Sequence, residues 1–298
     1  MPTWFIDSPR LYTDYSYFKD HFDWPNQGDG SQPLIYHCYW QGRLSRHHEL
    51  SLRSLIATQS PPYRVWVWLP PNDVIENRPF LNLFAKFPNV EFKAYVPEQE
   101  AIGTPYEQRI DLVAGRTSVP RRVALDISNY LRLLALAKYG GVYFDLDVLF
   151  LKDLRALCTQ EFFSQWSNRP FGNNALMSFR SNSPNIRDLI ERSIKLNTAR
   201  PGFLFRFSEM AGLPEPACVF PSFLFDPVWI AHDTGIPITT YCNRLEDFFA
   251  PSPPMTLSEF FPQSYAYHWH NQWNKPILPG TLAGHLYEDV CARCEREV

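Results

Sequence analysis

The 298-residue chain has no hydrophobic run that approaches the length of a membrane-spanning helix. Crossing a bilayer takes about 20 consecutive apolar residues. The N-terminus also lacks the basic segment followed by an apolar one that marks a signal peptide. From these two absences we expect a cytoplasmic protein with no integral membrane segment. A membrane-anchored protein that has lost its anchor is the alternative.

The sequence has no excess of basic charge. Its formal net charge is −3, whereas a nucleic-acid-binding domain usually carries a strongly basic patch. We therefore expect no nucleic-acid partner. Hydrophobic residues make up 45% of the chain, which is enough for a substantial core.

The six cysteines are spread along the chain and do not have the spacing of a disulfide framework. Cys291 and Cys294 have the spacing of half a zinc site, with His285 as the nearest extra ligand, but no second pair exists. A terminal helix that carries two thiols is therefore the favoured interpretation.

Glycine-rich nucleotide-binding loops are also missing: the chain has neither G-x-G-x-x-G nor a P-loop. Residues 33–96 nevertheless alternate between strand and helix patterns, which is typical of a nucleotide-binding α/β unit with a parallel sheet. We expect strands at residues 33–40, 64–69 and 90–96 and helices at 46–58 and 80–87. Nucleotide phosphates bound at the carboxyl ends of these strands must then be held by something other than a glycine loop.

The stretch from residue 126 to 151 combines an apolar helix, a two-glycine stop and a strand. Gly140 and Gly141 suit the left-handed backbone at the end of a helix. The strand carries Asp145 and Asp147 on one face of an otherwise apolar run. Two like charges there need a compensating cation, which a divalent metal supplies. The alternative is that both carboxylates end an edge strand and face water.

The order of motifs in this stretch, an arginine in a short helix, then Y-G-G and then a strand with D-x-D, resembles the sugar-binding DXD region of retaining glycosyltransferases. These include the α1,4-galactosyltransferase-like family, the initiating α-mannosyltransferase-like family and the large glucosylating toxins. The resemblance covers about residues 34–273 and is strongest over 128–148. It implies an α/β fold of the GT-A type, Rossmann-like, with a mixed central sheet flanked by helices.

We expect residues 1–32 to form an N-terminal extension with a short helix near residues 15–22. Residues 33–298 are expected to form a single GT-A domain. Within it, residues 33–152 would bind the nucleotide sugar, and residues 153–298 would form the acceptor side.

The resemblance also implies roles for residues in the nucleotide-binding half. The segment around Trp40 is similar to the H-x-x-W-x-G of these families, which implies that Trp40, with Tyr39 beside it, contacts the nucleotide base. A buried core tryptophan is the alternative. Arg132 matches the family arginine and would face the sugar or the diphosphate. Asn129 stands where the family has an aspartate, so either the sugar preference differs or Asp126 supplies the carboxylate.

Later segments resemble the family as well. Asn173 and Asn174 fall in a segment similar to N-N-A-x-M, which lines the cleft. His268 and His270 lie near the end of the resemblance, where a histidine reaches the metal or the diphosphate. We expect both histidines on one face of a strand, and imidazole with carboxylates suits Mn²⁺.

Two regions have no clear periodicity. Residues 97–122 read as a long polar loop, either a lid or a solvated surface loop. Residues 201–262 read as the variable acceptor side. Four acidic residues there are candidates to approach the anomeric carbon: Glu209, Glu215, Asp226 and Asp233.

Together these features predict a metal-dependent retaining glycosyltransferase of the hexosyltransferase class. It is expected to transfer a sugar from a nucleotide sugar to a carbohydrate or other hydroxyl acceptor with α linkage. The expected cofactor is Mn²⁺, with Mg²⁺ as the alternative, and a UDP-sugar donor is favoured over a GDP-sugar. The predicted catalytic residues are Asp145, Asp147 and Arg132, and the predicted metal ligands are Asp147, Asp145, His268 and His270. A metal-dependent phosphohydrolase and a non-catalytic sugar- or nucleotide-binding module with a degenerate site are the alternative functions.

Overall fold

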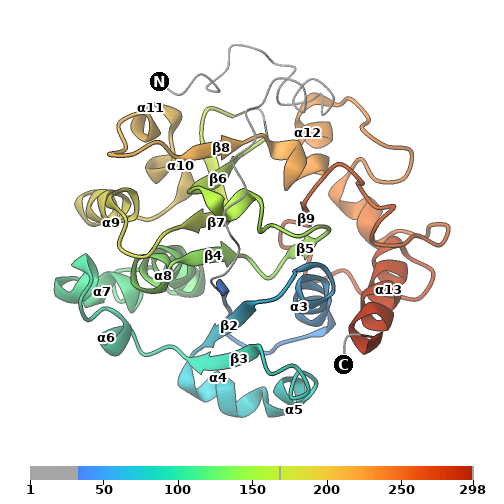
Figure 1. The fold of residues 1–298 in the computed structure, drawn as a ribbon, viewed down its shortest axis with the longest axis horizontal. Helices are drawn as coiled ribbons and strands as arrows, with labels where there is room; N and C mark the ends of the chain where they lie inside the picture. Colours follow the sequence, from blue (N-terminus) through green and yellow to red (C-terminus); the bar gives the residue numbers. More distant parts are fainter. Residues whose placement is uncertain (1–32, 168, 297–298) are drawn as a thin grey trace.

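The computed structural model describes residues 33–296 apart from residue 168, so the expected N-terminal extension and its helix lie outside the described residues. Its centre is a seven-stranded sheet with strand order β3-β2-β1-β4-β7-β6-β8 (Figure 1). The strands are β1 (Leu34–Tyr39), β2 (Tyr63–Leu69), β3 (Val90–Ala94), β4 (Gly141–Phe144), β6 (Phe162–Gln165), β7 (Gly172–Phe179) and β8 (Cys218–Phe220). β1 to β4 run parallel, β7 is antiparallel to its neighbours β4 and β6, and β8 is parallel to β6. The expected mixed sheet in an α/β fold is confirmed.

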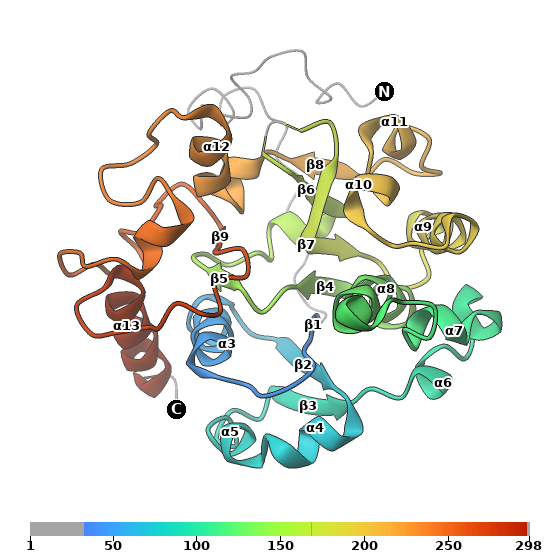
Figure 2. The ribbon, with the colours of Figure 1, turned by 180° about the vertical axis from the view of Figure 1, so that it is seen from behind.

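Helices cover both faces of the sheet, as the two opposite views in Figures 1 and 2 show. The main ones are α8 (Val123–Tyr139) and α9 (Pro184–Leu196) on one side and α3 (Arg46–Thr58) and α13 (Leu282–Arg296) on the other. Alternate side chains of β1 point into two hydrophobic clusters, one on each face of the sheet. Tyr36 and Cys38 belong to the cluster on the α3 side, and Tyr39 belongs to the cluster on the α8 side. A strand buried on both faces needs the continuous apolar sequence that β1 has.

The segment with Asp145 and Asp147 differs from its expected form. It is two strands instead of one, because β4 ends at Phe144 and β5 (Val148–Phe150) begins after a turn closed by Val148 N donating to Asp145 O at 3.0 Å. β5 leaves the large sheet and pairs antiparallel with β9 (Ala266–His268). The expectation that both aspartates share one strand face is therefore wrong. They lie in the turn between two sheets, where carboxylates do not interrupt the hydrogen bonds of a strand ladder.

The helix expected at residues 80–87 is also placed differently. The structure has α4 (Pro71–Glu76) and α5 (Arg78–Asn82), followed by tight turns. Both helices have a proline in the first turn, where no backbone N–H is needed. Asn77 separates them because its side chain bonds to the loop after β1, accepting from Leu44 N at 2.7 Å and donating to Gly42 O at 3.0 Å.

Residues 97–122 are not the irregular loop that was expected. They form four short helices, α6 (Pro97–Glu100), η1 (Pro105–Gln108), α7 (Ile110–Val113) and η2 (Pro120–Arg122). Three buried side chains, Tyr106, Leu112 and Val113, anchor this segment in the core beside α8 and α9. Because this segment is packed into the core, the structure does not support the interpretation of residues 97–122 as a mobile lid.

Residues 153–296 include many short elements. They are η3 (Leu157–Thr159), α10 (Pro201–Leu204), α11 (Phe207–Met210), η4 (Ser222–Leu224), α12 (Pro227–Thr234) and η5 (Leu245–Phe249). α13 carries Cys291 and Cys294 as thiols, as the terminal-helix interpretation expected. His285 contacts the carbonyl of Ser252 at 3.1 Å. Within the described part of the chain, we find no helix with the length and apolar character that crossing a membrane requires.

Candidate active site

Asp147 is held by the last strand of the chain. The β5–β9 register places Val148 opposite His268, so the turn before β5 meets the segment after β9. Asn271 N donates to Asp147 Oδ2 at 2.7 Å, and His268 Nε2 lies 3.1 Å from Asp147 Oδ1. Burial by itself raises the pKa of Asp147, but the His268 charge and these bonds outweigh burial and lower it to about 2. Asp147 is thus a fixed, ionised carboxylate.

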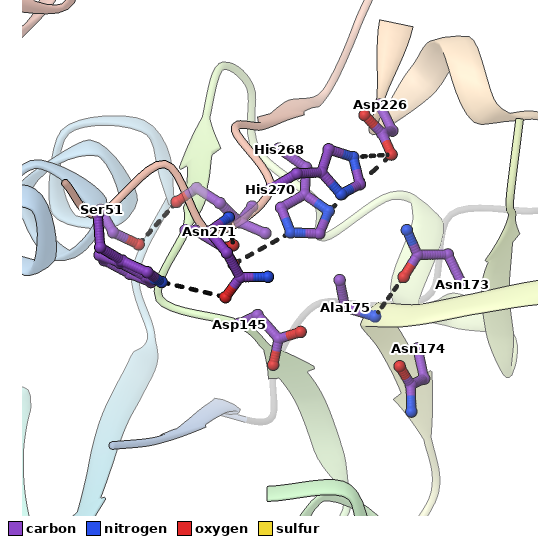
Figure 3. Close-up of polar contacts among 12 residues, drawn as sticks. Ser51, Asp145, Asn173, Asn174, Ala175, Asp226, His268, His270 and Asn271 are labelled. Atoms are coloured by element: carbon purple, nitrogen blue, oxygen red, sulfur yellow. Dashed lines mark hydrogen bonds and ion pairs between the residues drawn. The ribbon is translucent and has the colours of Figure 1, made fainter. Parts of the chain in front are cut away.

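His268 is the partner of that carboxylate. Burial favours the neutral imidazole, yet Asp147 outweighs it and raises the pKa of His268 to about 9. His270 is not on the same strand face, because β9 ends at His268 and both His270 and Asn271 have left-handed backbone, with φ of 48° and 59°. This turn stacks the two imidazoles with their centroids 3.8 Å apart (Figure 3). The expected backbone geometry is wrong, although the two histidines do lie together.

Asp226 joins the site from the N-cap position of α12. Its Oδ2 lies 2.7 Å from His270 Nε2 and 3.9 Å from His268 Nδ1. The other three acidic candidates of this region pair with arginines instead: Glu209 with Arg192, Glu215 with Arg180 and Asp233 with Arg169. No pattern in the sequence separates Asp226 from these three, because its place depends on how η4 and α12 pack.

Arg132 is almost completely buried and does not extend into open solvent. Its guanidinium donates to Asp145 Oδ1 at 3.1 Å, to Ser128 Oγ at 3.0 Å and to the carbonyl of Asn174. Burial raises the pKa of Asp145, and the positive charge of Arg132 opposes that rise. The structure therefore gives Arg132 a contact with Asp145 that the sequence pattern did not reveal.

Amide side chains form the wall beside Asp145 (Figure 3). Asn174 Nδ2 donates to Asn129 Oδ1 at 3.1 Å, and Asn173 Oδ1 accepts from Ala175 N at 2.9 Å. Asp126 pairs with Arg200 at 3.6 Å and lines an adjoining cavity of about 130 Å³, which Asn129 also lines. Asp126 is not among the described residues that line the cavity of Asp145 and Asp147.

Trp40 is half-buried at the end of β1 and stays part of an aromatic cluster. Its ring centroid lies 4.2 Å from that of His48 and 4.7 Å from that of Trp273. Its Nε1 donates to Arg43 O at 3.1 Å, which fixes the ring orientation. The contact between Trp40 and Trp273, 233 positions further along the chain, was not expected from the sequence.

The residues predicted as catalytic, donor-binding or metal-binding line one cavity of about 560 Å³. They are Tyr39, Trp40, Asn129, Arg132, Asp145, Asp147, Asn173, Asn174, His268 and His270. Pockets of about 300–1,000 Å³ with a few converging polar groups are typical of small-ligand sites. Among the described residues that line it, the only carboxylates are Asp145 and Asp147.

The residues at the floor of the cavity suit a divalent cation. One oxygen of Asp145, one of Asp147 and one nitrogen of His268 lie within 4.8 Å of one another. Two carboxylates with one imidazole form a donor set that suits Mn²⁺ or Mg²⁺ better than softer ions. Burial and the neighbouring charge of Asp147 raise the pKa of Asp145, whereas Arg132 and His268 oppose this rise; a bound cation would add to their effect.

Comparisons with known proteins agree with this geometry. Residues 46–164 match the family model described as glycosyltransferase sugar-binding region containing DXD motif. A search of curated proteins found no match.

Among solved structures, the glycosyltransferase GlyE of Streptococcus pneumoniae TIGR4 is similar with a TM-score of 0.50 and 12% identity, over 89% of this chain and 63% of that chain. The galactosyltransferase LgtC, in complex with donor and acceptor sugar analogs, is similar with a TM-score of 0.46 and 14% identity, over 88% of this chain and 96% of that one. Mouse xyloside xylosyltransferase 1 is similar with a TM-score of 0.44 and 12% identity, over 82% of this chain and 100% of that one.

Proposed function

We propose that the chain, a glycosyltransferase with the GT-A fold, moves a hexose from a nucleotide sugar to a hydroxyl group of a carbohydrate acceptor with retention of the α configuration. The proposed cofactor is Mn²⁺, with Mg²⁺ as the alternative, and the proposed donor is a UDP-sugar in preference to a GDP-sugar. The observation that carries the proposal is the convergence of Asp145, Asp147 and His268 in a cavity lined by aromatic and amide side chains.

The aromatic end of the cavity is the proposed site of the nucleotide base. Trp40 lies at the carboxyl end of β1, where ligands bind in open α/β sheets. Stacking of a base on such a ring contributes about 1–3 kcal/mol. Tyr39 also lines the cavity, but its buried ring packs on the opposite face of the sheet from Trp40, with its centroid 5.8 Å from that of Tyr95.

Asp145, Asp147 and His268 would hold the divalent cation. When bound, this cation would neutralise the charge that grows on the diphosphate as the bond to the sugar breaks. The chain prepares the ligands for this role: Asn271 fixes Asp147 and Arg132 fixes Asp145. Arg132 is thus proposed to act through Asp145, since its donors are already engaged.

Asn129, Asn173 and Asn174 are proposed to contact the donor sugar. Side-chain amides both donate and accept, so they recognise hydroxyl groups without charge. The mutual bond between Asn129 and Asn174 fixes which atoms remain for the sugar: Asn129 keeps its NH₂ group, and Asn174 keeps its carbonyl oxygen.

Retention is proposed to follow the front-face route. A double displacement needs a carboxylate nucleophile beside the anomeric carbon. The two carboxylates that line the cavity are both assigned to the cation, and Asp226 is behind the histidines. In the front-face route the acceptor oxygen forms its bond to the anomeric carbon on the face that the diphosphate leaves. The bonding electrons go to the departing phosphate oxygen, and that phosphate takes the acceptor's proton.

The two alternative functions lose their support once the family match is considered. A phosphohydrolase was favoured only by the pair of aspartates, and this pair belongs to the matched sugar-binding region. A non-catalytic module rested on Asn129, which still offers a hydrogen-bonding amide to the cavity.

The test is release of nucleoside diphosphate from a panel of UDP- and GDP-sugars, with and without Mn²⁺. We expect Mn²⁺-dependent release that is fastest with one UDP-sugar and falls at least about 100-fold in Asp147→Asn. Asp111→Asn, which removes only a surface partner of Arg109, is the matched control and should keep full activity. Metal-independent release, or equal activity of wild-type protein and Asp147→Asn, would refute the proposal.

A further inference from the structure

A second cluster of ligand-type side chains lies behind the first. Asp226, His268 and His270 offer one oxygen and two nitrogens within 4.8 Å of one another. Figure 3 shows the stacked imidazoles with Asp226 on one side and Asp145 on the other. His268 belongs to both groups, because Nε2 contacts Asp147 while Nδ1 lies on the side of Asp226.

Two atoms of this cluster are buried without a hydrogen-bond partner in the described part of the chain. They are His268 Nδ1 and Asp226 Oδ1. A buried polar atom left unsatisfied costs about 1–3 kcal/mol, and more if the group is charged. The Asp226 side chain is only 2% exposed, so bulk solvent does not reach it. Both atoms are therefore positioned to bind a ligand between these side chains.

The three groups are held in place before any ligand arrives. Asp226 N donates to Ser222 O at 2.6 Å, and Ser222 Oγ donates to Asp226 O at 3.1 Å, which fixes the start of α12. His270 packs against Trp229, with ring centroids 4.2 Å apart. Since His268 and His270 also line the main cavity, an ion can reach the cluster from there.

We propose that Asp226, His268 and His270 form a second cation site that binds Zn²⁺. Two imidazoles and one carboxylate with an open fourth position are a donor set typical of zinc. The set at Asp145 and Asp147 is richer in carboxylate and suits a harder ion. The two sites thus differ in the metal that they select.

Sharing His268 makes the two sites antagonistic, a consequence that rests on the proposed function. A neutral imidazole offers one lone pair and carries its proton on the other nitrogen. His268 with Zn²⁺ on Nδ1 therefore has its proton on Nε2 and cannot bind Mn²⁺ beside Asp147. Zn²⁺ would act as an inhibitor that competes with Mn²⁺.

The test is Zn²⁺ affinity of the metal-free protein, measured by competition with a chromophoric chelator, with Co²⁺ absorption as the probe of ligand type. We expect one Zn²⁺ per chain and a tetrahedral Co²⁺ spectrum. His270→Asn and Asp226→Asn should each lower Zn²⁺ affinity at least about 100-fold. Asparagine is chosen at position 270 because it tolerates the left-handed backbone there.

Three controls make the measurement specific. His232→Gln and Asp233→Asn alter side chains on the same helix outside the cluster and should leave Zn²⁺ affinity unchanged. Asp145→Asn should also keep it, because Asp145 belongs only to the first site. Thermal unfolding of each variant verifies that the fold is intact. If the affinity of a folded His270→Asn equals that of wild type, or if only Asp145→Asn loses Zn²⁺, the proposal is overturned.

A separate arm tests the antagonism. Mn²⁺ bound to the protein, followed by electron paramagnetic resonance, should be released by one equivalent of Zn²⁺ in wild-type protein and retained in Asp226→Asn. Since the Zn²⁺ titration needs no nucleotide sugar, a protein that binds Zn²⁺ but transfers no sugar would refute only the proposed function.

Discussion

Arg132 and Asp145 form an ion pair with Nη2 3.1 Å from Oδ1, and the arginine side chain is only 2% exposed. The same guanidinium lies over the ring of Tyr143 at 4.7 Å, so helix α8, strand β4 and the turn after it are joined through one side chain. The ion pair therefore connects Asp145 to the protein core, and the positive charge of Arg132 favours the ionised form of this carboxyl group.

Arg132→Gln should weaken both stability and cation binding. Removal of one partner of a buried pair costs about 3–5 kcal/mol; because Asp145 is 28% exposed, we expect the lower end or less, about 2–3 kcal/mol. The pKa of Asp145 should rise further, which weakens Mn²⁺ binding at neutral pH. Urea unfolding and Mn²⁺ titration measure the two effects. Arg109→Gln, at an exposed pair, should cost less than about 1 kcal/mol; an equal loss in both variants would contradict this account.

Histidine 37 should make the fold sensitive to acid. Trp68 Nε1 donates to His37 Nδ1 at 3.3 Å, so the proton is on Nε2, which donates to Gly140 O at 2.9 Å. Burial lowers the pKa of His37 from 6.5 to about 4. Protonation of the unfolded chain below pH 6.5 thus removes stability, at up to about 1.4 kcal/mol per pH unit, until the folded state is protonated near pH 4.

The measurement is the free energy of unfolding between pH 8 and pH 4.5 in wild type and His37→Gln. The variant should be less stable at pH 8 and should lose less stability on acidification. Identical slopes would show that His37 is not one of the groups responsible.

Asn129→Asp should change the choice of donor sugar. A carboxylate makes charge-assisted hydrogen bonds roughly twice as strong as neutral ones. It can still accept from Asn174 Nδ2, but it no longer offers the sugar an NH₂ group. We expect the ratio of kcat/KM between two UDP-hexoses that differ at one hydroxyl to shift by about tenfold. A uniform change for all donors would place Asn129 away from the sugar.

Trp40→Ala should weaken nucleotide binding whatever the sugar. Loss of one base–aromatic stack costs about 1–3 kcal/mol, or about 5–150-fold in Kd. Trp40→Phe should retain part of that affinity. Calorimetric titration with UDP and Mn²⁺ measures it, and Trp66→Phe, which alters a ring that packs on His37 and Tyr139, serves as the control. An unchanged Kd in Trp40→Ala would assign this tryptophan to the core alone.

Gly141→Ala should prevent the fold from forming normally. A Cβ at this position would lie 2.1 Å from Ile35 O, and φ is +101°. β4 would have to move away from β1 and carry the Asp145 turn with it. Gly202→Ala, where a Cβ meets nothing within 4 Å, should be tolerated. Circular dichroism and thermal unfolding compare the two; similar melting temperatures would contradict the expected clash.

The features that were predicted correctly are determined by local sequence patterns. Gly140 does end α8 in left-handed backbone, and the run of apolar residues in β1 does form a buried strand. Helix α3 also begins and ends at the expected residues. Each of these features depends on neighbours a few positions away, so composition and spacing were sufficient.

The parts that could not be predicted depend on distant contacts. Asp147 leaves the strand because β5 pairs with β9, and Asn271, which binds Asp147, is 124 positions further along the chain. The selection of Asp226 from four acidic residues depends on the packing of η4 and α12. The periodicity of a sequence depends on residues a few positions apart, so it cannot reveal such distant contacts.

The pairing of β5 with β9 also has a consequence for biosynthesis. A ribosome delivers Asp145 and Asp147 long before it delivers His268 and Asn271, the residues that fix Asp147. Until then the nascent chain holds two closely spaced carboxylates without the imidazole and backbone amide that stabilise them. The arrangement around Asp147 is therefore completed only after Asn271, 124 positions further along the chain, has been synthesised.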